Sequence, residues 1–200
     1  MSKDIFKTIA APAEGQYTEK RSKFLAFAFP VSTVEDIKML IDEYQKKYFD
    51  ARHLCYAYML GHDRLNFRAN DNGEPSGTAG KPILGQINSN ELTDILIIVV
   101  RYFGGVKLGT SGLIQAYKAA AAEAIAAATI IEKTVDVQLT ISFEYIAMNQ
   151  VMRVVKEENP TIVSQQFDND CVMTLATRAS LMPRLHDRLE KLRVVTFVSD

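Results

Sequence analysis

The sequence lacks the features expected of a secreted or membrane-spanning protein. Its longest purely aliphatic run covers residues 95–100, whereas a membrane span needs ~18 apolar residues. Cysteine is rare, with only Cys55 and Cys171 in 200 residues, and the first ten residues have no apolar core ahead of a cleavage site of small residues. We therefore expect no signal peptide, no membrane partner, two reduced thiols and a cytoplasmic location.

The chain also lacks a strong excess of either charge. It has 23 basic and 24 acidic residues, and its formal net charge is −1. This balance excludes a protein that holds nucleic acid by bulk positive charge, as a histone does, but it leaves open a local basic patch. The apolar and charged fractions, 48% and 24%, are those of an ordinary globular protein. The length fits one large domain or two small ones.

The last third of the chain predicts a separate domain, residues 132–200, with the element order β-α-β-β-α-β. Alternation of apolar and polar residues at 135–143 predicts a half-buried strand. The other expected elements are a helix from Met148 that stops at Asn159-Pro160, strands at 162–167 and 171–177 joined by a tight hairpin at Asp168-Asn169-Asp170, a helix with Ser180 as its N-cap, and a strand at 194–198. This order is that of the ferredoxin-like fold.

The first two thirds, residues 1–131, predict a mixed sheet with helices on one face, so the whole chain is expected to be α+β. The expected strands lie at 15–20, 23–31, 53–60, 65–69 and 94–103. One expected helix follows a capping box at 32–35, and two others cover residues 81–87 and 111–129. The run at 94–103 is almost continuously apolar, which is typical of a strand buried on both faces. Alanine fills eight of the ten positions 119–128, and such small side chains let a helix pack close to a sheet.

Glycine is scarce outside one part of the chain, because nine of the ten glycines lie between Gly61 and Gly112. Seven of these nine lie in two loops, at 70–80 and 104–112. The second loop joins a buried strand to a helix, so the free N–H groups of the helix start, flanked by Arg101 and Lys107, predict an anion-binding site. Its backbone residues are Gly104, Gly105, Gly109, Thr110 and Ser111. The alternative is a tight strand-to-helix connection that binds nothing.

This second loop differs from a nucleotide-binding P-loop. Gly104 and Gly109 have the P-loop spacing, but Thr110 and Ser111 follow them, where that motif requires a lysine and then Ser or Thr. The lysine that grips the phosphates is therefore missing. We exclude an ordinary P-loop ATPase and expect no cofactor.

Two further groups of residues are open to a catalytic and to a structural interpretation. The first glycine-rich loop carries acid, hydroxyl and amine groups that could build a catalytic or metal site, although such groups more often bond their own turn; they are Asp71, Glu74, Ser76, Thr78 and Lys81. His53 and Cys55 stand two apart on a strand and so share a face. They could form a nucleophilic pair, but a buried thiol beside a hydrogen-bonded histidine is more common. The spacing supports no metal site.

Long motifs in this part of the chain resemble the YigZ/IMPACT family. They are GEPSGTAGKPIL at 73–84, VVRYFGGVKLGTSGLIQAY at 99–117, SKF at 22–24 and ARHLCYAY at 51–58. Two departures are the single aspartate, Asp71, before the first loop's glycine, where the family often has two, and Ser111 in place of a glycine. The resemblance implies a first domain similar to the second domain of ribosomal protein S-five and to domain IV of elongation factor G. It also implies a second domain similar to the ferredoxin-like domain V of that factor.

The resemblance further implies a role in translation, which eukaryotic members of the family regulate. We expect a non-enzymatic protein that binds RNA, the ribosome or a translation-related protein. The expected charge donors are Arg52, Lys81, Arg101 and Lys107. The alternative is an enzyme that acts on a phosphorylated or otherwise anionic small molecule, with His53 and Glu74 as acid/base groups. The sequence predicts no oligomeric state.

Overall fold

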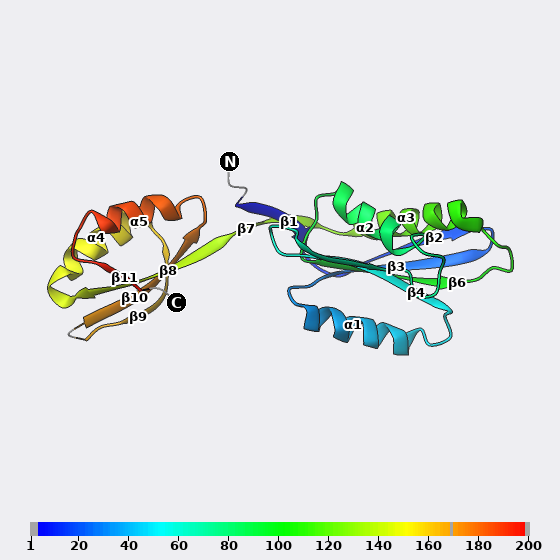
Figure 1. The fold of residues 1–200 in the computed structure, drawn as a ribbon, viewed down its shortest axis with the longest axis horizontal. Helices are drawn as coiled ribbons and strands as arrows, with labels where there is room; N and C mark the ends of the chain where they lie inside the picture. Colours follow the sequence, from blue (N-terminus) through cyan, green and yellow to red (C-terminus); the bar gives the residue numbers. More distant parts are fainter. Residues whose placement is uncertain (1–3, 169, 199–200) are drawn as a thin grey trace. The chain divides into compact units, whose positions relative to one another are not determined.

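The computed structural model describes residues 4–168 and 170–198. By its contacts the chain divides into two compact units, Phe6–Lys133 and Thr134–Asp200, and Asp4 and Ile5 belong to the second. Figure 1 shows the helices and strands of both units. All neighbouring strands in the two larger sheets are antiparallel, and the protein is α+β. None of the described helices is long and apolar enough to cross a membrane.

The first unit is built on a five-stranded sheet with the strand order β2-β3-β6-β4-β5. The strands are β2 (Ala13–Glu19), β3 (Ser22–Pro30), β4 (His53–Leu60), β5 (Asn66–Asn70) and β6 (Ile95–Tyr102). Each begins and ends within two residues of its predicted range. The five predicted strands are therefore confirmed.

Helices cover both faces of this sheet. α1 (Val34–Lys47) packs on one face, while α2 (Gly80–Ser89) and α3 (Gly109–Ala127) pack on the other (Figure 1). Alternate residues of β6 join two separate core clusters, Ile95, Ile97 and Val99 with α2 and α3, and Leu96, Ile98 and Val100 with α1. The prediction that this strand is buried on both faces is confirmed. The prediction of helices on one face is wrong, because a strand that is apolar on both sides needs a cover on each.

The prediction of a mixed sheet is also wrong, for a topological reason. A helical connection such as α1 usually joins parallel neighbours, and β3 and β4 do run parallel to each other. However, β6 lies between them and pairs antiparallel with both. The inserted strand leaves no parallel neighbours in this sheet.

The capping box of α1 lies one residue later than the sequence predicts. Thr33 is the N-cap, and its hydroxyl accepts a hydrogen bond from the N–H of Asp36 at 3.1 Å. The Asp36 carboxylate accepts one from the N–H of Thr33, also at 3.1 Å. The predicted pair was Ser32 and Glu35; an aspartate three residues after Thr33 completes the same reciprocal pattern.

The start of α3 also precedes its predicted position. The helix begins at Gly109, so Thr110 and Ser111 lie in its first turn and the second glycine-rich loop is shorter than expected. As the alanine pattern predicts, α3 lies close to the sheet. A Cβ on Gly15 of β2 would lie only 2.3 Å from the backbone nitrogen of Ala124.

The second unit confirms the predicted element order β-α-β-β-α-β. Its elements are β8 (Asp136–Glu144), the 3-10 helix η1 (Tyr145–Ala147), α4 (Met148–Glu158), β9 (Thr161–Gln166), β10 (Asp170–Arg178), α5 (Met182–Glu190) and β11 (Thr196–Val198). The sheet order is β11-β8-β10-β9, and one face packs on both helices. Asn169 of the predicted hairpin lies outside the described residues. The N-cap of α5 is Leu181 and not the predicted Ser180. The Ser180 hydroxyl donates to the Asp4 carboxylate instead.

A two-stranded sheet pairs β1 (Ile5–Ile9) with β7 (Ile130–Thr134). The predicted division between residues 131 and 132 falls within β7, whereas the two units divide between Lys133 and Thr134. Independent folding of the two parts of the chain stays a prediction.

Candidate functional site

The strand register brings three separate segments to one end of the five-stranded sheet. Lys23, near the start of β3, pairs with Tyr102 at the end of β6, and His53, at the start of β4, pairs with Arg101. The residues that flank these strand ends include five exposed cations. We call them the basic end: Lys20, Arg21, Lys23, Arg52 and Lys107. Among the described residues, none of these five side chains makes an ion pair.

Two of these cations form a strained turn. Glu19 pairs with Ser22, so Lys20 and Arg21 alone connect β2 to β3. Both have positive φ, 46° and 66°, as a two-residue turn of this hand requires. Such turns favour Asn-Gly, and side-chain-bearing residues pay about 1–2 kcal/mol each in this region. Strain of this kind gathers at functional sites. The sequence predicts a hairpin or meander here, with strands at 15–20 and 23–31, but not the positive φ values, because the turn carries no Asn or Gly.

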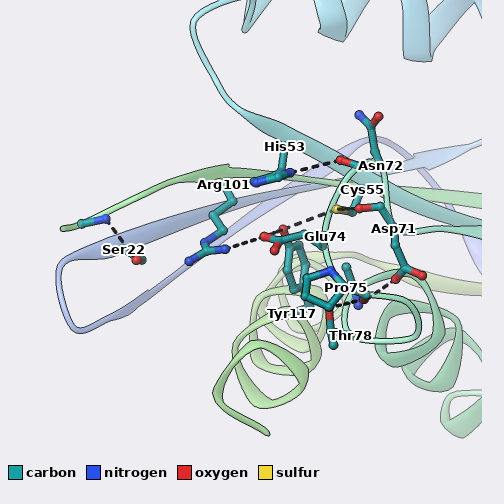
Figure 2. Close-up of polar contacts among 12 residues, drawn as sticks. Ser22, His53, Cys55, Asp71, Asn72, Glu74, Pro75, Thr78, Arg101 and Tyr117 are labelled. Carbon is teal, nitrogen blue, oxygen red and sulfur yellow. Dashed lines mark hydrogen bonds and ion pairs between the residues drawn. The ribbon is translucent and has the colours of Figure 1, made fainter. Parts of the chain in front are cut away.

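The second glycine-rich loop lies directly against this turn. The N–H of Gly104 donates to the hydroxyl oxygen of Ser22 at 3.1 Å (Figure 2). A Cβ on Gly104 would lie 2.1 Å from the carbonyl carbon of Arg21, so only glycine fits here. The close approach joins the loop that carries Lys107 to the turn that carries Lys20 and Arg21.

The first turn of α3 borders the same region. Its N-cap, Leu108, offers no side-chain hydrogen bond, so the first N–H groups of α3 have no capping partner from that residue. A hollow beside this turn is lined by Tyr17, Glu19, Lys20, Leu108, Ser111, Gly112 and Gln115. Gly109 has a φ of +71° and Gly105 a φ of +88°. Lys20 and Ser111 share this hollow with the carboxylate of Glu19, whose negative charge opposes the binding of an anion there.

A buried ion pair lies behind the basic end. The Nη1 of Arg101 donates to Oε1 of Glu74 at 2.6 Å, and their side chains are only 8% and 3% exposed. The Tyr117 hydroxyl donates to the same carboxylate oxygen at 2.9 Å (Figure 2). The guanidinium also lies over the rings of Phe24 and Phe103. Arg101 and Glu74 are thus paired with each other, although the sequence had suggested separate roles for them.

His53 and Cys55 are both bonded to the first glycine-rich loop. The Cys55 thiol donates to the carbonyl oxygen of Asp71 at 2.9 Å, and burial raises the pKa of this thiol to about 12. The thiol is therefore protonated at neutral pH and is a poor nucleophile. Nδ1 of His53 lies 3.1 Å from the carbonyl oxygen of Asn72, so this nitrogen carries the proton. Both contacts agree with the structural interpretation, in which a buried thiol lies beside a hydrogen-bonded histidine.

The first glycine-rich loop is a network of its own hydrogen bonds. The Asp71 carboxylate accepts from the N–H groups of Gly77, Ala79 and Gly80 at 2.8–2.9 Å and so caps α2. Burial raises the pKa of Asp71, but these three bonds and the nearby charge of Lys81 together hold it below its ordinary value. Lys81 lies in the first turn of α2, beside this network. In the described part of the chain, no group of three or more His, Cys, Asp or Glu residues could hold a metal ion.

We predict that Asp71→Ala lowers the free energy of unfolding at pH 7 by about 2 kcal/mol, because α2 loses a charged cap. The folded-state pKa of Asp71 is depressed, so its contribution is complete above the unfolded pKa of about 4 and is lost as the pH falls through the folded pKa. Urea unfolding should show the difference from the unsubstituted protein shrink toward pH 3. Asp42→Ala, at an exposed position on α1, is the control. A difference independent of pH would contradict the prediction.

Known proteins resemble this chain over most of its length. The profile of the Impact N-terminal domain matches residues 20–125. YigZ of Escherichia coli (strain K12), an IMPACT family member, is 30% identical over 182 residues, which cover 90% of this chain and 89% of that protein. YvyE of Bacillus subtilis (strain 168), another member, is 33% identical over 75% of this chain and 69% of its own length.

A solved structure agrees with these matches. A crystal structure described as that of a hypothetical protein aligns with a TM-score of 0.73 and 27% identity over 98% of both chains. The basic end, the Arg101–Glu74 pair and both glycine-rich loops fall inside the segment that the domain profile matches. The chain is therefore a member of the IMPACT family and is similar to YigZ.

Proposed function

We propose that this protein binds RNA through the basic end, in a role linked to translation. The observation that carries the proposal is the gathering of five exposed cations from three segments, none of them paired with an acidic group in the part of the chain that the structure describes, in a protein whose net charge is −1. Phosphate contacts by such side chains supply most of the affinity for nucleic acid. The charge donors in this proposal are Lys20, Arg21, Lys23, Arg52 and Lys107.

The other expected residues take different parts in the proposal. Arg101 and Glu74 hold the frame behind the basic end, since their charges neutralise each other. The N–H groups at Gly109, Thr110 and Ser111 give the start of α3 a partial positive charge, but Glu19 lines the hollow beside them, so we assign no phosphate to them. Lys81 lies in α2, with Asp71 beside it, and we leave it out of the RNA contact.

The link to translation follows from the family resemblance. The proposal includes a likeness of the first unit to the second domain of ribosomal protein S-five and to domain IV of elongation factor G. It also includes a likeness of the second unit to a ferredoxin-like domain. A ribosomal protein and a translation factor both work where RNA is the dominant surface. The ribosome is the proposed setting, and a cytoplasmic location follows from it.

The alternative function, an enzyme for an anionic small molecule, has less support. It requires His53 and Glu74 to exchange protons with a substrate. The Glu74 side chain is 3% exposed and is paired with Arg101, and Nδ1 of His53 is bonded to the loop backbone. These contacts favour the binding function.

The salt dependence of RNA binding tests the proposal. Arg21→Ala and Lys107→Ala should each reduce the slope of log K against log salt by about 0.7 for single-stranded RNA, one phosphate contact each. Fluorescence anisotropy of a labelled oligoribonucleotide from about 50 to 200 mM salt measures it. Lys38→Ala, an exposed lysine in α1 outside the basic end, should leave the slope unchanged. Equal slopes for all variants, or no RNA binding, would refute the proposal.

A further inference from the structure

We propose that the basic end takes RNA as an unpaired strand, with one base stacked on Phe103 and the adjoining phosphates on Arg21 and Lys23. This inference rests on the proposed function and names the form of RNA that it selects. It derives from an open part of the sheet surface next to the strained turn.

This open surface lies where α1 no longer covers the sheet. Gln16 and Thr18 of β2 are exposed, as is Lys23 of β3. A hollow in this region is lined by Gln16, Arg21, Lys23, Leu25, Tyr102 and Phe103. Two cations, two aromatic rings and an amide thus line it without a carboxylate, whereas the neighbouring hollows contain Glu19 and Glu14. Its charge suits phosphate.

Phe103 is the residue that points to a base. Its side chain follows β6 directly and is 54% exposed. The Arg101 guanidinium lies over the ring, 5.8 Å from its centroid, and Arg101 is itself held by Glu74 at 2.6 Å. A ring fixed in this way needs little further ordering to receive a base. Stacking on an aromatic side chain contributes about 1–3 kcal/mol per base.

The remaining lining residues suit the edge and the backbone of the same nucleotide. The Tyr102 hydroxyl donates to the Asp50 carboxylate at 2.8 Å, which fixes the second ring beside Phe103. The Gln16 amide can both donate and accept, as the hydrogen-bonding edge of a base requires. Arg21 and Lys23 supply positive charge to the flanking phosphates.

An unpaired strand fits this hollow better than a duplex does. In A-form RNA the base faces are stacked inside the helix, and the deep major groove excludes side chains. A duplex could contact Arg21 and Lys23, but its bases could not reach Phe103. Single strands, loops and bulges expose the base faces that stack on aromatic rings. The presence of Phe103 among the cations therefore selects single-stranded RNA.

The test compares one RNA strand of about 12 nucleotides, alone and annealed to its complement, by fluorescence anisotropy with the full chain. Phe103→Ala should weaken binding of the single strand by about 5- to 150-fold and leave the salt slope unchanged, because no phosphate contact is lost. Phe103→Tyr should keep the affinity, since it keeps the ring. Phe67→Ala is the matched control, because Phe67 is also exposed, by 56%, but lies on the far edge strand β5. Thermal unfolding checks that each variant is folded.

The outcomes separate this inference from the proposed function. Selective loss with Phe103→Ala, and preference of the unsubstituted protein for the single strand, support the inference. Equal binding of the duplex, or no effect of Phe103→Ala while Arg21→Ala still lowers the salt slope, overturns it and leaves RNA binding intact. Binding of neither RNA overturns both, and the basic end would then serve an acidic protein partner.

Discussion

Replacing Glu74 by alanine is expected to lower the free energy of unfolding by about 3–5 kcal/mol, the usual effect of leaving one buried charge without its partner. The pair it forms with Arg101 is 2.6 Å long, and both side chains are more than nine-tenths buried. The Tyr117 hydroxyl, which donates to the same oxygen at 2.9 Å, would lose its acceptor as well. A surface ion pair of equal length would cost about 1 kcal/mol or less.

A double replacement distinguishes the effect of the buried charge from a simple loss of packing. Arg101→Met with Glu74→Leu removes both charges and keeps apolar volume, so it should recover much of the stability that Glu74→Ala loses. Urea unfolding of the full chain followed by circular dichroism measures the free energy of unfolding of each variant. The control is Glu157→Ala, which breaks exposed ion pairs with Arg153 and Arg188 on the second unit. A loss below about 1 kcal/mol for Glu74→Ala would contradict the prediction.

The strands of this protein are visible in its sequence because their signals are local. His53–Leu60 has the predicted bounds, and the apolar run that contains β6 correctly predicts burial on both faces. The order of the strands in the sheet, in contrast, is not visible in local signals. Nothing in the local pattern of β3 or β4 states that a later strand inserts between them, since that choice depends on pairing between distant segments.

The candidate site was predictable in place but not in detail. The crowding of glycines identified both loops, and Gly104 and Gly109 do have the special geometry that this suggested. The sequence could not show that Glu74 reaches Arg101, because the loop that carries Glu74 must first fold over the sheet. The hairpin at Lys20 and Arg21 was predictable from its two strands, but its strain was not, because its positive φ values come without the glycine that usually marks them.

A methyl group at Gly104 is expected to have the second large effect. Its Cβ would lie 2.1 Å from the carbonyl carbon of Arg21 and 2.3 Å from the nitrogen of Ser22, so the atoms it meets are backbone and cannot rotate away. The loop and the turn must separate, and the hydrogen bond from Gly104 to the fully buried Ser22 is lost with them. We expect Gly104→Ala to lower the free energy of unfolding by about 2–4 kcal/mol.

Two neighbouring variants isolate the cause. Gly105→Ala meets no atom within 4 Å but must adopt a φ of +88°, which costs about 1–2 kcal/mol. Ser22→Ala removes only the hydrogen bond, also about 1 kcal/mol. If the close approach holds the basic end together, Gly104→Ala should lose more stability than either and should also weaken RNA binding, because Arg21 and Phe103 move apart. If Gly104→Ala is as stable as Gly105→Ala, the loop shifts to make room for the methyl group, and the turn keeps its shape without the close contact to the loop.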